Sequence, residues 1–75
     1  MGSIMSTLLS YNMDKDEVLI VIDGKGYRYK SVTAFHTDEE NKYFTFTGIE
    51  IVENTKCDVS VYADVYELKP SIGGN

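Results

Sequence analysis

The stretch Glu17–Val32, which reads EVLIVIDGKGYRYKSV, decides the fold of this 75-residue chain. It opens with five apolar residues, Val18–Ile22, of which four are Val or Ile; such a run suits a pleated strand and is too short for an ordinary helix. Both faces of that strand are apolar, so we expect it to be covered on both sides, as where a sheet folds over itself. Asp23-Gly24 is the strongest short-range signal for a hairpin turn. Tyr27–Lys30 then alternates rings with cations, which predicts an antiparallel partner strand with one exposed face.

The next part of the chain predicts two more long strands. The strand that begins at Tyr27 is expected to run to about His36, with a bulge near Ser31 where the alternation slips. The polar segment Thr37–Lys42 is expected to be a hairpin loop. Tyr43–Glu53 follows as one strand that turns a corner at Gly48, or as two strands that meet there, because the apolar phase shifts after the glycine.

The C-terminal part predicts one long amphipathic strand. Asn54–Lys56 is expected to be a turn, and Val59–Leu68 alternates apolar and polar residues until Pro70 stops the pattern. Four or five strands, short turns and no convincing helix indicate an all-β protein. We therefore expect a small antiparallel meander, curled into an SH3-like or OB-like partial barrel.

The organisation expected from the sequence is a single domain over residues 17–69. Residues 5–16 are an N-terminal segment that could form a short edge strand or one helical turn. Residues 1–4 are expected to be a cloning remnant, and residues 70–75 a flexible tail. The chain shows no signal peptide and no apolar run long enough to span a membrane, and its single cysteine, Cys57, cannot form an internal disulfide. These features predict a cytoplasmic protein.

The sequence carries no signature of an enzyme, and we expect neither catalysis nor a cofactor. There is no nucleophile elbow and no glycine loop that could cradle phosphate. A metal site is not expected, because His36 lies beside acids but belongs to no spaced set of His and Cys ligands. The acids at Asp14–Glu17 lack the glycine and the terminal glutamate of a calcium loop.

Acidic residues are the most informative polar group in the chain. Twelve acids against seven bases give a net charge of −5, which favours solubility or a basic partner over nucleic acid or an anionic membrane. Acids two apart on a strand lie ~6.7 Å from each other, about two steps of a DNA strand whose charges advance ~3.4 Å. They could therefore occupy the DNA site of a basic protein, or they could only keep the chain soluble. The acids we select as candidates for partner binding are Asp14, Asp16, Glu17, Asp38, Glu39, Glu40, Asp58 and Asp64.

Tyrosines supply a second candidate surface. Tyr62 and Tyr66 are expected to lie on the outer face of the last strand, where they could bind a protein partner or a second copy of the chain. The segment Lys25–Lys30 is a weaker alternative, since interleaved cations and rings can bind nucleic acid. Its start resembles the Lys/Arg-Gly-aromatic opening of the RNA-binding strand of RRM and cold-shock proteins, but Arg28 and Lys30 depart from that pattern.

The small size, the acidity and the tyrosine- and acid-rich segments Glu17–Val32 and Asp58–Leu68 together resemble the small host-takeover proteins of lytic bacteriophages. Among these, the chain is most similar to the acidic DNA-mimic inhibitors of the bacterial histone-like HU protein. The resemblance implies a homodimer, encoded by a phage, that blocks the DNA-binding surface of a nucleoid protein in the bacterial cytoplasm. It rests on no diagnostic motif and assigns no individual residue.

Overall fold

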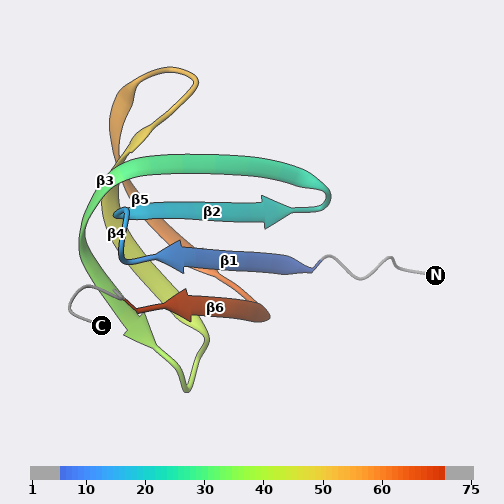
Figure 1. The fold of residues 1–75 in the computed structure, drawn as a ribbon. Coiled ribbons are helices and arrows are strands. Elements are labelled where there is room, and N and C mark those ends of the chain that lie inside the picture. Colours follow the sequence, from blue (N-terminus) through green and yellow to red (C-terminus); the bar gives the residue numbers. More distant parts are fainter. Residues whose placement is uncertain (1–5, 71–75) are drawn as a thin grey trace.

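The computed structural model describes residues 6–70 and forms one six-stranded sheet (Figure 1). Residues 1–5 and 71–75 lie outside the described residues, and so do the expected cloning remnant at 1–4 and all but Pro70 of the expected tail. The strands are β1 (Thr7–Asn12), β2 (Glu17–Ile22), β3 (Lys25–Asp38), β4 (Tyr43–Glu50), β5 (Thr55–Tyr62) and β6 (Val65–Lys69). No helix that could cross a membrane occurs between residues 6 and 70.

The strand order is β5-β4-β3-β2-β1-β6, so the predicted all-β, curled sheet is confirmed, with six strands rather than four or five. Strands β1 to β5 form the predicted antiparallel meander. The pairing of β6 with β1 is parallel, a feature that the sequence pattern did not predict. The sheet is not closed, because its two edge strands, β5 and β6, are joined through a corner and form no ladder with each other.

The hairpin between β2 and β3 forms as the Asp-Gly signal predicts. Asp23 and Gly24 both have positive φ angles, of 50° and 82°, which are the angles of a type I′ turn. This turn sets the register that places Val18 opposite Tyr29 and Ile20 opposite Tyr27. Residues directly opposite each other share a face, so both tyrosines lie on the inner face of the sheet.

Strand β3 bends from one half of the sheet into the other (Figure 1). Its first part pairs with β2 and its last part with β4, and its register against β4 shifts twice, between Lys30 and Thr33 and between Thr33 and His36. Ser31 and Ala34 have φ angles of 52° and 55°, so a residue in the left-handed region lies within each shift. The predicted bulge at Ser31 is confirmed, and a second one at Ala34 completes the bend.

The core lies on the inner side of this curl. No polar or charged side chain between residues 6 and 70 is buried. Phe35, half-buried, stacks on Tyr11 with ring centroids 4.1 Å apart, and it also contacts Phe44 and Phe46. Rings from β1, β3 and β4 therefore hold the two halves of the sheet together. The buried side chains that form the core are Leu9, Val18, Ile20, Val32, Phe44, Phe46 and Ala63.

The predicted corner at Gly48 is wrong, since β4 pairs with β5 in unbroken register from Tyr43 to Glu50. Gly48 is buried on the same face as Phe46, and Ile49 lies on the other face. A Cβ atom at Gly48 would lie 3.2 Å from Tyr29 Cβ and 3.3 Å from Val32 Cγ2. The glycine therefore allows close approach of β3, and the apparent change of phase comes from a half-buried isoleucine on the outer face.

The expected turn at Asn54–Lys56 is also misplaced: the turn spans Ile51–Asn54, and β5 begins at Thr55. The Glu50 carboxylate fixes it by accepting backbone N–H groups from Val52 and Glu53. Glu50 thus ends β4 and starts the turn before the asparagine is reached.

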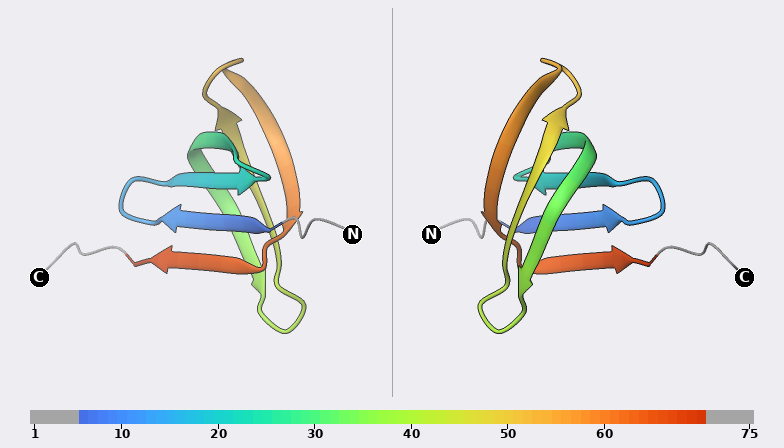
Figure 2. Two further views of the ribbon diagram at one scale, coloured as in Figure 1. Left: turned by 90° about the vertical axis from the view of Figure 1, so that its right-hand side faces the viewer. Right: turned by 90° about the vertical axis from the view of Figure 1, so that its left-hand side faces the viewer.

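The single long strand expected over Val59–Leu68 is instead two strands. Ala63 and Asp64 leave the ladder, and the chain turns from the β5 edge of the sheet to the β6 edge. The alternation of apolar and polar residues continues through Ala63, although β5 ends before it. Ala63 fits the pattern because it is buried at the corner, 1% exposed. Figure 2 shows the result, with β5 crossing at a steep angle to β6 and β1.

The N-terminal segment belongs to the sheet. Thr7–Asn12 is a strand, one of the two forms expected, but it lies between β2 and β6 and not at an edge. Leu9 is fully buried there. The core therefore includes part of the segment that was expected to lie outside residues 17–69.

Candidate functional site

The fold brings the β3–β4 turn, Glu39–Lys42, against the corner between β5 and β6. The backbone N–H of Ala63 donates to the carbonyl of Lys42 at 3.0 Å, which fastens the corner to the turn. Asp64 follows in the chain, so an acid from the corner lies near the acids of the turn. We call this region the acidic end, and it consists of Asp38, Glu39, Glu40 and Asp64 with the tyrosines Tyr43, Tyr62 and Tyr66.

Asp38 holds the turn in shape. Its carboxylate accepts the backbone N–H of Asn41 at 3.3 Å and the side-chain Nδ2–H of Asn41 at 2.8 Å. These hydrogen bonds favour the ionised form and lower the pKa of Asp38 below its ordinary value of 3.8. Asp38 is therefore a carboxylate at neutral pH, and it fixes the positions from which Glu39 and Glu40 project.

Tyr66 connects the turn to the core. Its hydroxyl donates to Glu39 Oε1 at 3.3 Å, while its ring lies 4.9 Å from the ring of Phe44. Burial, and then the charge of Glu39, raises the pKa of Tyr66, so the hydroxyl keeps its proton and remains a donor. The Glu39 carboxylate is thus held close to the body of the protein.

Tyr62 supplies the exposed aromatic surface of this end. It is 68% exposed, and its ring lies 4.7 Å from that of Tyr43, its cross-strand partner. An exposed ring packed on the half-buried ring of Tyr43, beside carboxylates, offers both flat apolar area and hydrogen bonding, a combination enriched in protein interfaces. The pair lies on the outer face of the sheet.

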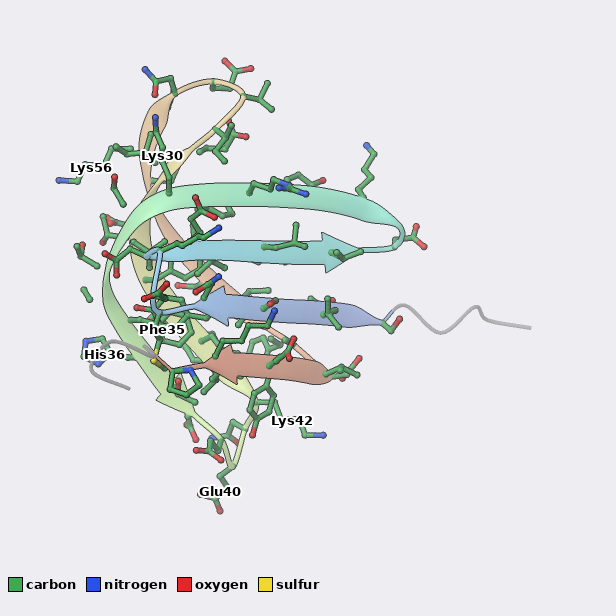
Figure 3. The ribbon with its side chains drawn as sticks, viewed as in Figure 1. Lys30, Phe35, His36, Glu40, Lys42 and Lys56 are labelled. Atoms are coloured by element: carbon green, nitrogen blue, oxygen red, sulfur yellow. The ribbon has the colours of Figure 1, made fainter. Side chains whose placement is uncertain are left out.

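The acidic end carries a local excess of negative charge, because its four acids are accompanied by one cation, Lys42. In Figure 3, Glu40 points away from the protein at the tip of the turn, and Lys42 extends from the same turn in a different direction. All four acids are exposed to solvent. The surface can therefore attract a cationic partner through its local excess of negative charge.

The other predicted acids lie elsewhere. Asp14, Asp16 and Glu17 belong to the β1–β2 turn and the start of β2, next to the bulge in β3, where the Asp16 carbonyl accepts the Val32 N–H at 2.9 Å. Asp58 lies along β5 and accepts a hydrogen bond from the hydroxyl of Thr47 at 2.8 Å. The eight candidates thus form one group at the acidic end, a second at the β1–β2 turn and a separate residue on β5.

The expectation that Tyr62 and Tyr66 share one outer face is wrong. Tyr66 pairs with Leu9 and contacts Phe44, so it faces inward, whereas Tyr62 faces outward. Because the ladder breaks at Ala63 and Asp64, the side chains of Tyr62 and Tyr66 lie on opposite faces of the sheet. Sequence reasoning also missed Tyr43, whose role depends on the register of β4 against β5, and no local signal in the sequence gives that register.

The segment Lys25–Lys30 divides its two kinds of side chain between the faces of the sheet. Tyr29 is half-buried and packs edge-on against Phe46, with centroids 5.3 Å apart, while Arg28 and Lys30 are exposed on the other face. Lys30 pairs with Ile49, and Ile49 pairs with Lys56, so the two lysines flank one isoleucine on the outer face. Figure 3 labels both lysines. Rings and cations do not form one surface on which bases could stack beside bound phosphates.

No group of three or more His, Cys, Asp or Glu side chains within residues 6–70 is placed to hold a metal ion. Cys57 is half-buried, and its thiol donates to the carbonyl of Thr55 at 3.3 Å. His36 is exposed on β3 opposite Thr45 (Figure 3). The groups gathered at the acidic end are carboxylates and phenols, which suit charge-assisted hydrogen bonds with a cationic surface.

No protein-family model, no curated protein and no solved structure matches this chain.

Proposed function

We propose that this protein binds a basic DNA-binding protein through the acidic end and competes with DNA for it, in the manner of the phage inhibitors of histone-like HU proteins that the sequence resembles. The observation that carries the proposal is the docking of the β3–β4 turn on the β5–β6 corner. That contact assembles four predicted acids with two predicted tyrosines from strands that are distant in the sequence.

Preorganisation supports this proposal. The Asp38–Asn41 hydrogen bonds and the Tyr66–Glu39 hydrogen bond restrain the acids before a partner arrives, so less conformational entropy is lost on binding. Opposite charge accelerates the encounter with a basic surface, and added salt weakens that attraction. Tyr62 then offers apolar contact at short range, where charge alone gives little specificity.

The direct test is displacement of a labelled DNA duplex from a histone-like HU protein, followed by fluorescence anisotropy. The wild-type chain should release the duplex at low salt and lose potency as salt rises. The double variant Glu40→Lys/Asp64→Lys should lose about tenfold or more in potency, since close charge pairs at interfaces couple by roughly 1.5–7 kcal/mol.

A matched control separates the site from overall charge. Glu53→Lys/Glu67→Lys changes two exposed acids that are not among the candidates for partner binding. At two charges for each reversal, both double variants change the net charge from −5 to −1. The control should keep most of the wild-type potency. Equal losses in the two double variants would assign the effect to net charge and contradict the proposal, as would a failure of the wild type to displace DNA at any salt concentration.

A second function is favoured by Tyr62, which at 68% exposure is an unusually open aromatic side chain. The outer ring pair could serve a protein-interaction module that depends on aromatic contact more than on charge. In that case Tyr62→Ala would abolish association with the partner, Glu40→Lys/Asp64→Lys would change it little, and salt would have little effect.

The homodimer implied by the resemblance has a specific place in our proposal. Leu8 pairs with Val65 across β1 and β6, and the two are 37% and 54% exposed on the outer face. We expect two copies to meet there, which would bring two acidic ends into one assembly. Leu8→Lys should then convert a sedimenting dimer to a monomer; a wild type that sediments as a monomer would remove the dimer from the proposal.

A further inference from the structure

Strand β5 is eight residues long, and one of its edges pairs with no other strand within residues 6–70. It lies at the end of the sheet order, and the ladder it forms within the described part of the chain is with β4. Every second backbone N–H and C=O group along its other side is therefore available to an added strand. The opposite edge, β6, is shorter, with five residues.

An apolar pocket of about 160 Å³ lies beside this edge. Ile20, Ile22, Tyr27 and Tyr29 form its wall on the β2–β3 side, and Val59 and Val61 face them from β5. Ser60 also lines the pocket although its side chain alternates to the outer face, so the pocket reaches the backbone of the edge strand. Side chains of a strand added to β5 would enter this pocket at alternate positions.

The outer face of β5 sets the chemistry of the remaining positions. An added strand would place its other side chains next to Asp58, Ser60 and Tyr62. A cationic side chain fits opposite the carboxylate of Asp58 and over the ring of Tyr62. Beyond Tyr62 the edge continues to the acidic end, where four acids accompany one lysine. Lys56 disfavours a cation only at the start of the strand. An acidic segment would meet like charge at Asp58 and again at the acidic end.

We propose that the free edge of β5 binds an extended segment of the basic partner, with apolar side chains in the pocket and Arg or Lys on the outer face. This inference rests on the proposed function, and it adds that the partner is recognised as an extended strand. The segment would extend the sheet by backbone hydrogen bonding, and its sequence would alternate between apolar and basic residues.

The probe is a fluorescein-labelled peptide of alternating arginine and valine, matched in length to β5. The comparison peptides are one with the same composition in two blocks and one of alternating glutamate and valine. NMR of the full chain would report binding through chemical shifts and through hydrogen exchange of the β5 amides. We expect the alternating basic peptide to bind, to protect amides of residues 55–62 and to shift the signals of Ile20, Ile22 and Tyr27.

Two variants test the two sides of the pocket. Asp58→Lys on β5 and Tyr27→Lys on β3, both at exposed positions, should each weaken the alternating basic peptide by about tenfold. Glu67→Lys, which makes the same charge change as Asp58→Lys at an exposed position on β6, should leave the affinity within about twofold. Spectra of each variant would show that the sheet is retained.

Three results would overturn the inference. The block peptide could bind as well as the alternating one, the β5 amides could stay unprotected while only the acidic end shifts, or the β5 amides could become protected with protein concentration alone, which would place a second copy on the edge. The first two leave the proposed function intact, because a basic partner would still bind at the acidic end. Conversely, a protected β5 edge without displacement of DNA from the HU protein would contradict the proposed function alone.

Discussion

Gly48 shows at the scale of one residue how the curl is achieved. The missing side chain lets β4 pass beside Tyr29 and Val32, at distances that a Cβ atom would make too short, 3.2 and 3.3 Å. Both neighbours belong to β3 and lie on either side of its first bulge. The glycine is therefore a packing requirement of the bend, and its own backbone does not need the left-handed region.

Gly48→Ala should destabilise the protein by about 1–3 kcal/mol, because the added methyl group forces β3 and β4 apart in a packed core. Thermal or urea unfolding monitored by circular dichroism would measure the change. Gly26→Ala is the control, since its Cβ atom would meet only Leu19 Cδ1, at an ordinary 3.6 Å. Equal effects of the two substitutions would contradict the close-approach explanation.

Asp38 makes a prediction about pH at the same scale. Its folded-state pKa is lowered by hydrogen bonds from Asn41, so the folded state binds a proton less readily than the unfolded state does. The stabilisation is therefore present above the unfolded pKa and is lost as the pH falls through the folded value. Asn41→Ala should move the Asp38 pKa, followed by carboxyl NMR signals, back toward 3.8.

The dependence of the melting temperature on acidic pH gives a second measurement of the effect of these hydrogen bonds. In Asp38→Asn, the melting temperature should fall less steeply as the pH is lowered below about 4, because the titrating carboxyl group is gone. An unchanged slope in Asp38→Asn, or an Asp38 pKa that Asn41→Ala does not move, would show that the turn is held by other contacts.

At the scale of the element, β3 determines the shape of the sheet. It pairs with β2 over its first half and with β4 over its second, and the residues between are bulged at Ser31 and Ala34. Each bulge adds twist and re-aims the strand, so one continuous strand serves two differently oriented halves. A left-handed conformation costs a non-glycine residue roughly 1–2 kcal/mol, which the surrounding pairing must offset.

Ala34→Gly should therefore stabilise the protein by about 0.5–1 kcal/mol, the relief of left-handed strain minus the extra freedom of glycine in the unfolded chain. Thr33→Gly, at the neighbouring position without a positive φ angle, should destabilise it by about 0.5–1 kcal/mol. Urea unfolding of the two variants side by side would measure the opposite signs. A loss of stability in Ala34→Gly equal to that in Thr33→Gly would contradict the assignment of strain to residue 34.

The sequence predicts those elements whose determinants are local. The β2–β3 hairpin follows from its apolar run and from Asp23-Gly24, and the slip in alternation locates the bulge at Ser31. Nothing in the residues Thr33-Ala34-Phe35 announces the second bulge, because alanine has no preference for a positive φ angle. The break at Ala63 and the parallel pairing of β6 depend on where β1 lies in space, which a local pattern does not contain.

The candidate site divides in the same way. The acids of the turn Asp38–Glu40 could be selected from the sequence because a polar loop between strands must be exposed. Their proximity to Asp64 and Tyr66 could not, since it depends on the contact between the β3–β4 turn and the corner. The expected outward position of Tyr66 was wrong for the same reason.

At the scale of the whole molecule, the net charge of −5 is distributed unevenly over the surface. The acidic end gathers four acids and one lysine, whereas Lys30 and Lys56 flank Ile49 on the outer face at the other end of β4 and β5. Such polarity orients the molecule in the field of a basic partner before contact. In our proposal, this end of the sheet and the adjoining edge of β5 form the binding surface.

The measurement that tests this account most directly is an NMR titration of the isotope-labelled chain with an unlabelled histone-like HU protein, at low and at high salt. We predict that backbone signals of the acidic end, at Asp38–Tyr43 and Tyr62–Tyr66, shift first and most strongly, and that the shifts disappear at high salt. Shifts concentrated at Lys25–Lys30, shifts that persist unchanged at high salt, or no shifts at all would contradict it.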